Sequence, residues 1–170
     1  MFKVLIAEDE PPIMRMIKST LESVDSDFKV TECCINGKNA VEKLKNEDFD
    51  IVITDIKMPI MTGIELAGWI YQNKPDTKVI IVSGYSDFEY ARKALEYKVF
   101  DYLLKPISKD KVSELTQRIK SEIAEKNKMF AENNTIVILA CAGAYLLYGS
   151  EVLLPGERFW TDSGIDTFMD

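Results

Sequence analysis

The chain has 170 residues, 46% of them hydrophobic and 29% charged, and its formal net charge is −7. That composition is ordinary for a soluble globular protein, and the length allows one full domain and a remainder. An acidic chain is a poor binder of nucleic acid, because duplex affinity rests largely on Lys and Arg side chains that contact phosphates. The lack of histidine excludes Ser-His-Asp catalysis, Cys-His catalysis and most zinc sites.

Short apolar runs alternate along the chain with amphipathic stretches. The runs occupy residues 4–7, 30–35, 51–53, 79–82 and 100–104. Three of them are nearly continuous blocks of aliphatic residues, which is typical of central strands in a parallel sheet that is covered on both faces.

Helix starts lie between these runs. The pair Pro11-Pro12 follows an acidic turn and suits a first helical turn. Residues 62–65 and 86–89 both match the capping box, and Tyr85 and Tyr90 flank the second as a hydrophobic staple. These signals predict helices that begin after the third and fourth strands.

The last predicted helix begins near Ser108, which is expected to cap it, with Ile107 and Val112 as a staple. Its apolar residues recur at spacings of three and four and form one stripe: Val112, Leu115, Ile119 and Ile123. Five strand–helix units in this order predict an α/β fold, a doubly wound five-stranded parallel sheet of the flavodoxin-like order 2-1-3-4-5.

The chain changes character after about residue 128. Residues 131–134 are polar and linker-like, so a linker is expected over residues 129–134, and residues 135–170 are too few for an ordinary independent core. We expect residues 1–128 to form the first domain and residues 135–170 to be a short C-terminal extension, the truncated start of a second domain. The uncharged stretch 135–150 is shorter than the roughly 20 residues of a spanning helix, so a buried strand or core segment is expected there, not a membrane span.

The three cysteines are Cys33, Cys34 and Cys141. The odd count, and the adjacent pair within an apolar run, predict reduced, buried thiols in a cytoplasmic protein. Residues 1–3 lead directly into a strand-like run without the pattern of a signal peptide.

Polar residues of particular types end four of the five predicted strands. They are Glu8-Asp9-Glu10, Asp55, Ser83-Gly84 and Lys105-Pro106. Because the carboxyl ends of parallel strands meet at one edge, these side chains are expected to converge. Clustered carboxylates need a cation, and oxygen ligands favour Mg²⁺.

The chemistry of this set is phosphoryl transfer. Asp55 can be the nucleophile, since a carboxylate can form an aspartyl phosphate. Lys105 supplies positive charge to the phosphoryl oxygens, Ser83 supplies a hydroxyl hydrogen bond, and Gly84 leaves room beside the phosphate.

The same residues, together with Lys57-Met58-Pro59 after the aspartate and with Tyr102, resemble the receiver domain of bacterial two-component response regulators over residues 3–125. The resemblance implies that Asp55 accepts a phosphoryl group from a sensor histidine kinase. It also implies that Mg²⁺ is bound by Asp9 and Asp55 directly, by Glu8 through water, and by the backbone carbonyl of Lys57.

The resemblance further implies a conformational switch. Ser83 turns towards the phosphate, Tyr102 follows it inward, and the face made by helix 4, strand 5 and helix 5 changes shape, with a homodimer through that face as one mode of association. The Lys105–Pro106 peptide bond is expected to be cis.

A finer resemblance lies in residues 83–91 and 99–106, which look like the subgroup of response regulators whose output is an AraC-type helix-turn-helix domain. It implies transcription regulation, with DNA bound only through an output domain that this chain lacks, and no contact with a membrane.

Two alternatives compete with a phosphorylation switch. A phosphatase of the haloacid dehalogenase type also uses an aspartate nucleophile and Mg²⁺, but needs a second aspartate two residues later, where this chain has Lys57. That lysine argues against an enzyme that turns over and for a phosphoacceptor that only takes up and loses its own phosphoryl group. A degenerate receiver that acts only by docking is disfavoured because all the expected residues are present.

Overall fold

The computed structural model describes the backbone of residues 1–84, 88–148, 160–161 and 164–165, and the side chains of residues 1–84, 90–126, 128 and 129. The chain divides into two compact units, residues 1–118 and residues 119–170.

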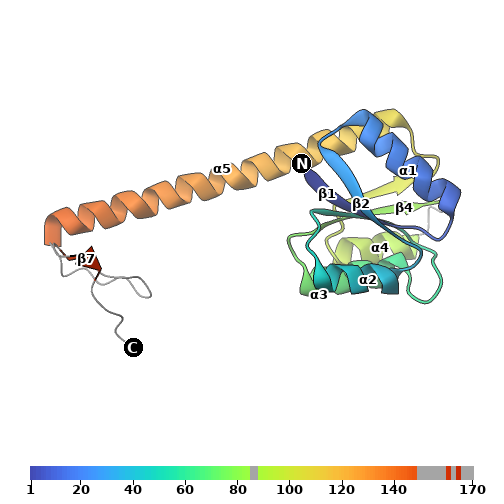
Figure 1. Ribbon diagram of the computed structural model, residues 1–170, viewed down its shortest axis with the longest axis horizontal. Helices are drawn as coiled ribbons and strands as arrows, with labels where there is room; N and C mark the ends of the chain where they lie inside the picture. Colours follow the sequence, from blue (N-terminus) through green and yellow to red (C-terminus); the bar gives the residue numbers. More distant parts are fainter. Residues whose placement is uncertain (85–87, 149–159, 162–163, 166–170) are drawn as a thin grey trace. The chain divides into compact units, whose positions relative to one another are not determined.

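Strands and helices alternate through the first unit (Figure 1). In chain order they are β1 (Phe2–Ala7), α1 (Pro11–Val24), β2 (Phe28–Cys34), α2 (Gly37–Asn46), β3 (Ile51–Asp55), α3 (Gly63–Asn73), β4 (Lys78–Ser83), α4 (Phe88–Glu96), β5 (Asp101–Leu104) and the start of α5 (Lys109–Tyr148). The five strands form one parallel sheet in the order β2-β1-β3-β4-β5. The predicted flavodoxin-like fold is therefore confirmed.

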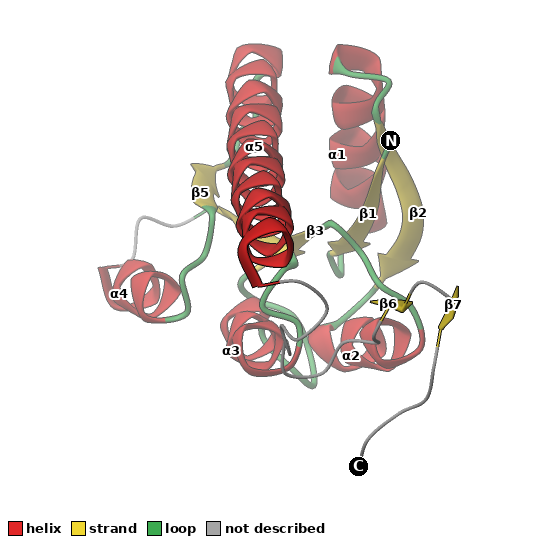
Figure 2. Cartoon of the chain, turned by 90° about the vertical axis from the view of Figure 1, so that its left-hand side faces the viewer, coloured by secondary structure: helices red, strands yellow, loops and turns green. Residues whose placement is uncertain are grey.

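Helices cover both faces of the sheet, with α1 and the start of α5 on one side and α2, α3 and α4 on the other (Figure 2). On the α2–α3 side, Leu5, Val52 and Ile81 from the sheet pack with Leu44 and Leu66 from these helices, and all five are buried. Alternate residues of the same strands face α1 and α5, because successive side chains of a strand point to opposite faces.

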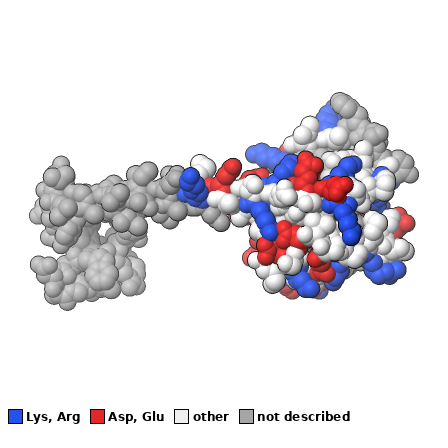
Figure 3. All heavy atoms as spheres, turned by 90° about the horizontal axis from the view of Figure 1, so that it is seen from above, with Lys and Arg blue, Asp and Glu red and all other residues white. Residues whose placement is uncertain are grey.

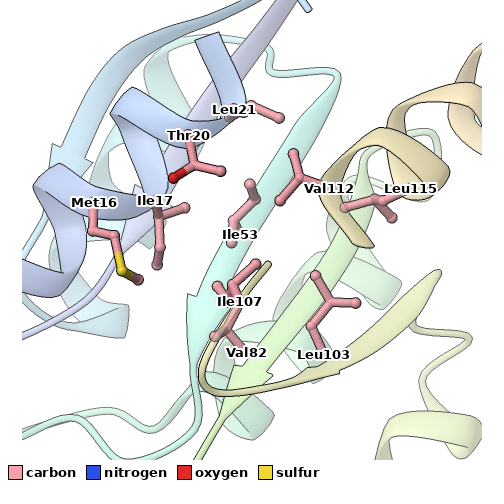
Figure 4. A pocket seen from close by; sticks show the side chains of 10 residues that line it. All are labelled: Met16, Ile17, Thr20, Leu21, Ile53, Val82, Leu103, Ile107, Val112 and Leu115. Carbon is pink, nitrogen blue, oxygen red and sulfur yellow. The ribbon is translucent and has the colours of Figure 1, made fainter. Parts of the chain in front are cut away.

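A small apolar cavity of about 20 Å³ lies on the α1–α5 side (Figure 4). Ile17 and Leu21 of α1, Ile53 and Val82 of the sheet, and Val112 of α5 line it. One added methylene group would fill much of this space, so a slightly larger side chain could be accommodated between α1 and α5.

The edge strand β2 carries a bulge where it pairs with β1. Val30 pairs with Val4 and Cys34 with Ala7, and the register shifts between Val4 and Leu5. Cys34 consequently packs into the core on the α2–α3 side, although it is an even number of residues from Val30. An extra residue in one strand turns its side chains over to the other face.

The expectation that all the cysteines are buried is wrong for Cys33, because of this bulge. Cys34 is buried, but Cys33 is exposed, and both thiols are free. Burial raises the pKa of Cys34 to about 11. The side chain of Cys141 lies outside the described residues.

The helix starts follow the predicted signals wherever they can be compared. Pro11 begins α1. Thr62 and Glu65 form both halves of the capping box of α3. Ser108 Oγ accepts a hydrogen bond from the backbone N–H of Lys111 at 3.3 Å. The second predicted box, residues 86–89, and its staple with Tyr85 lie outside the described side chains. The Lys105–Pro106 bond is cis, as expected.

The helix α5 continues to Tyr148. Of the two expectations for residues 135–150, a strand is wrong as far as Tyr148, whereas a core segment stays a prediction because these side chains lie outside the described residues. Residues 129–134, where a linker was expected, are helical as well. A division into residues 1–128, 129–134 and 135–170 stays a prediction. Within the described part of the chain, no helix is long and apolar enough to span a membrane.

Candidate functional site

The residues that follow four of the strands meet at one edge of the sheet. Asp55 ends β3 and pairs with Val82, so that Ser83 lies one residue beyond it at the end of β4. Ser83 in turn pairs with Leu104, and its carbonyl accepts a hydrogen bond from the backbone N–H of Lys105 at 2.8 Å. The parallel register thus brings together residues that are far apart in the sequence.

Three carboxylates form an acidic cluster at this edge. One oxygen each of Glu8, Asp9 and Asp55 lies within 4.8 Å of the others. Glu8 is fully buried and Asp55 is 8% exposed, whereas Asp9 is open to solvent. Oxygen ligands at this separation suit a hard divalent cation such as Mg²⁺. The donor set therefore fits the metal that the sequence predicts.

The Lys105 ammonium bridges two of these carboxylates. Its Nζ lies 2.8 Å from Asp55 Oδ1 and 2.9 Å from Glu8 Oε2. Burial raises the pKa of Glu8, against the lowering effect of Lys105. Burial acts to lower the pKa of Lys105, but the hydrogen bonds to Asp55 and Glu8 outweigh it and raise that pKa. Lys105 is thus held in its charged form between the two acids.

Backbone groups hold the other carboxylate oxygens. The N–H of Lys57 donates to Asp55 Oδ2 at 2.7 Å, and the N–H of Glu10 donates to Glu8 Oε1 at 3.4 Å. The Asp55 carboxylate is therefore held on one oxygen by a cation and on the other by a peptide group. An acceptor fixed in this way does not need to reorient before it reacts.

Three other predicted residues lie on β4, just after it and on β5. Ser83 is buried, and Tyr102 is half-buried on β5, where it packs against the core on the α2–α3 side. Gly84 is exposed, and a Cβ at its position would meet no atom within 4 Å. Among the described residues, nothing therefore crowds the position of a side chain at residue 84, where room for a phosphoryl group was expected.

Two features of the site were not predicted from the sequence. One is the ion pair between Lys105 and Glu8, because the sequence assigned Lys105 to the phosphoryl group and Glu8 to the metal. The other is Gly63, the first residue of α3, where a Cβ would lie 1.9 Å from the backbone oxygen of Asp55. A glycine directly after the cap residue Thr62 was the visible signal, but its neighbour in space was not.

Charges are mixed on the surface around this fold. In the face of residues 1–118 seen in Figure 3, basic and acidic side chains are interspersed and do not gather by sign. A surface that binds a nucleic-acid backbone would be expected to carry a stripe of basic residues, and the described residues on the face shown do not form one.

Known proteins share this fold and sequence. The family model of the response regulator receiver domain matches residues 4–120. The chain is 34% identical over 127 residues to the uncharacterized transcriptional regulatory protein YesN of Bacillus subtilis. The match covers 75% of this chain and 34% of YesN. The chain is also 33% identical over 126 residues to the transcriptional regulatory protein HptR of Staphylococcus aureus. This match covers 74% of this chain and 49% of HptR.

Solved structures agree with these relatives. The receiver (REC) domain of AraT, a response regulator from Geobacillus stearothermophilus, superposes with a TM-score of 0.66 at 32% identity, over 74% of this chain and 98% of that one. The response regulator TrrA from Thermotoga maritima, solved in complex with Mg²⁺ and BeF, gives a TM-score of 0.62 at 28% identity, over 70% and 99% of the two chains. This chain thus spans a whole receiver domain but at most half the length of YesN or HptR.

Proposed function

This chain belongs to the response regulator receiver domain family, and on that premise we propose that Asp55 accepts a phosphoryl group from a sensor histidine kinase and thereby switches the surface of the domain. The observation that carries the proposal is the Lys105 ammonium, 2.8 Å from Asp55 Oδ1 within the acidic cluster. A fixed cation beside a fixed carboxylate is what in-line transfer to an aspartate requires.

In the proposed step, a carboxylate oxygen of Asp55 attacks the phosphorus of a phosphohistidine. The new P–O bond forms as the P–N bond breaks, and the imidazole nitrogen keeps the bonding pair and takes a proton from solvent. The ammonium of Lys105 neutralises charge on the phosphoryl oxygens, and the hydroxyl of Ser83 donates a hydrogen bond to one of them. Gly84 leaves space for the group, since no atom lies within 4 Å of where a Cβ would be.

The proposed metal ligands are Asp9, Asp55 and the backbone carbonyl of Lys57, with Glu8 acting through water. When bound, Mg²⁺ supplies positive charge that offsets the charge of the acceptor and of the incoming phosphoryl group. The full burial of Glu8 and its contact with Lys105 support a place behind the ion. The complex of the similar TrrA with Mg²⁺ and BeF also supports this cofactor.

The proposed output of the switch is the face formed by α4, β5 and α5. Ser83 and Tyr102 lie on adjacent strands, and Tyr102 pairs with Ile81, two residues before Ser83. A move of Ser83 towards the phosphate would open space that the Tyr102 ring can follow. A change of that face, and a homodimer through it, are the expected consequences.

The protein is proposed to be a phosphoacceptor and not an enzyme that turns over. A phosphatase with an aspartate nucleophile needs a general acid or base to cycle. Lys57 occupies the position where such a carboxylate would be needed, and its side chain is exposed. Uptake and loss of its own phosphoryl group is all that the residues support.

Transcription regulation is proposed from the relatives. YesN and HptR are transcriptional regulatory proteins, and this chain spans 34% and 49% of their lengths. We infer that a DNA-binding output domain of the AraC type acts with this receiver, that DNA is contacted only there, and that the protein works in the cytoplasm with its kinase.

The test is incubation of the chain with Mg²⁺ and acetyl phosphate, followed by intact mass measurement. We expect a gain of one phosphoryl group in the wild type and none in Asp55→Asn. Lys105→Met should lower the initial rate by at least about 100-fold, the order seen when one charge-stabilising donor is removed from an active site.

Asp50→Asn is the matched control, because Asp50 precedes the same strand β3 at its opposite end. It should take up the phosphoryl group like the wild type. A wild type that gains no mass, with or without Mg²⁺, refutes the proposal. Repeated hydrolysis of phosphate esters would favour the phosphatase.

A further inference from the structure

Ile60 lies in the loop between β3 and α3 with a backbone angle φ of 70° and a side chain that is 78% exposed. Positive φ is uncommon for any residue with a side chain, and for a β-branched residue it is a clear outlier. Glycine or asparagine would adopt this conformation at lower cost. The exposed side chain of Ile60 contributes little packing that could offset the strain.

The loop that carries Ile60 is fixed on both sides. Met58 is buried and Met61 packs against the core, so the chain points inward on either side of Ile60. The backbone N–H of Met61 donates to the carbonyl of Pro59 at 2.7 Å, and the N–H of Gly63 donates to the carbonyl of Ile56 at 3.0 Å. Ile60 is consequently held outward at the apex of a closed loop.

This apex is close to the acceptor. Gly63 is in direct contact with the backbone of Asp55, and the three residues from Gly63 to Ile60 span at most about 11 Å. A standard protein interface covers about 800 Å² on each partner, which corresponds to a patch with a radius of about 16 Å. An interface of standard size that is centred on Asp55 is therefore wide enough to include Ile60.

We propose that Ile60 is a specificity-determining contact for the protein that donates the phosphoryl group, and that it packs against apolar side chains beside the donor's phosphohistidine. This inference rests on the proposed function of Asp55. Within the described residues it is the one strained isoleucine, it lies in the loop that follows Asp55, and its outward side chain has no role in the domain's own core. Small phosphodonors have no surface that could reach it.

The experiment separates donors by size. Wild type, Ile60→Gly and Ile60→Asn are phosphorylated by acetyl phosphate, by phosphoramidate, which has the P–N bond of phosphohistidine but no protein surface, and by autophosphorylated sensor histidine kinases. The kinases are the cytoplasmic portions of those encoded in the source genome, profiled one by one, and the fastest donor is used. Both variants accommodate positive φ, so folding should be preserved.

We expect both small donors to act equally on all three proteins. Transfer from the kinase should fall by about tenfold in kcat/KM for both variants, the factor that corresponds to loss of one modest apolar contact. Leu95→Ala is the matched control, since Leu95 is 79% exposed, as much as Ile60, but lies near the last residue of α4, at the end of the helix that is away from Ser83. It should behave as the wild type with every donor.

Three outcomes overturn the proposal. Unchanged kinase transfer in both variants removes Ile60 from the interface. An equal loss with acetyl phosphate shows that Ile60 acts on the chemistry and not on the donor. An equal loss in Leu95→Ala shows that exposed apolar side chains act in general and not Ile60 in particular. A wild type that accepts from no donor would instead refute the function of Asp55 itself.

Discussion

Substitution of Gly63 by alanine is expected to damage both the fold and the acceptor. The added Cβ would lie 1.9 Å from the carbonyl oxygen of Asp55 and 2.8 Å from Thr54 Oγ1. The oxygen belongs to the central strand β3, which is buried throughout, so it cannot yield as a flexible side chain would. The start of α3 would have to retreat by about 1.5 Å to restore an ordinary contact.

The change in the free energy of unfolding is the sum of three effects, of which two destabilise the fold and one stabilises it. Overpacking in a dense interior costs about 1–3 kcal/mol. Loss of the hydrogen bond from Gly63 N–H to the carbonyl of Ile56, at 3.0 Å, costs about 1 kcal/mol more. The better helix propensity of alanine returns at most about 1 kcal/mol. We expect the free energy of unfolding to fall by about 1–4 kcal/mol, which leaves a typical domain folded.

The acceptor should suffer in proportion to the displacement. Asp55 is two residues before Lys57, whose N–H fixes Asp55 Oδ2, and both lie on the segment that α3 would push. A misplacement of about 1 Å at a reacting group can cost about 100-fold in rate. Urea unfolding and the initial rate of uptake from acetyl phosphate measure the two effects separately.

Two other glycines provide matched controls. In Gly68→Ala, on the same helix, the nearest atom is in the Tyr97 ring at 3.1 Å, which can shift. In Gly84→Ala no atom lies within 4 Å. Both should unfold within about 1 kcal/mol of the wild type. If Gly63→Ala is as stable as both of these variants and as reactive as Gly68→Ala, the close contact between Gly63 and Asp55 has no effect on fold or acceptor.

Three further predictions concern other parts of the first unit. Thr62→Ala should cost about 1 kcal/mol at pH 7 through loss of the α3 cap. Hydrogen bonds from Thr62 hold the pKa of Glu65 below its usual value, so the stabilisation by the Glu65 charge is present at neutral pH and is lost as the pH falls. The difference in the free energy of urea unfolding between wild type and Thr62→Ala should therefore shrink at pH 3, and a constant difference would contradict this prediction. Val112→Ile should raise the free energy of unfolding by up to about 0.8 kcal/mol, because one methylene enters the apolar cavity; a decrease in the same assay would show that the cavity cannot accept it. A thiol reagent at pH 8 should label Cys33 well before Cys34, which is buried and has a pKa of about 11; peptide mapping by mass spectrometry would show it, and equal rates would refute the assigned faces of β2.

The order of the sheet and the place of the site were predictable because they depend on local signals. Blocks such as residues 51–53 are apolar on both faces, and only a covered parallel strand makes use of such a block. Once the strands are parallel, their carboxyl ends share one edge. Asp55 and Lys105 therefore had to come near each other, although 50 residues separate them in the sequence.

The features that were missed depend on distances that no local signal encodes. Nothing in the residues around Glu8 says that Lys105 will bind it, or that Gly63 will lie against Asp55. Cys33 was expected to be buried because the apolar run suggested it, but one extra residue in β2 exposed it. The stretch after residue 134 was ambiguous, since an apolar run without charges fits a strand or a helix equally well by its pattern.

The bulge in β2 also bears on how copies of this protein can meet. β2 is an edge strand with one side of its backbone free of partners in the sheet, and such edges invite pairing with another chain. A bulge twists the edge out of register, and the charged Lys29 and the partly exposed Glu32 lie on either side of the shift. The opposite edge, β5, is only four residues long. Pairing with a strand of another copy is thereby disfavoured at both edges of the sheet. A closed dimer is then expected to form mainly through contacts between helices.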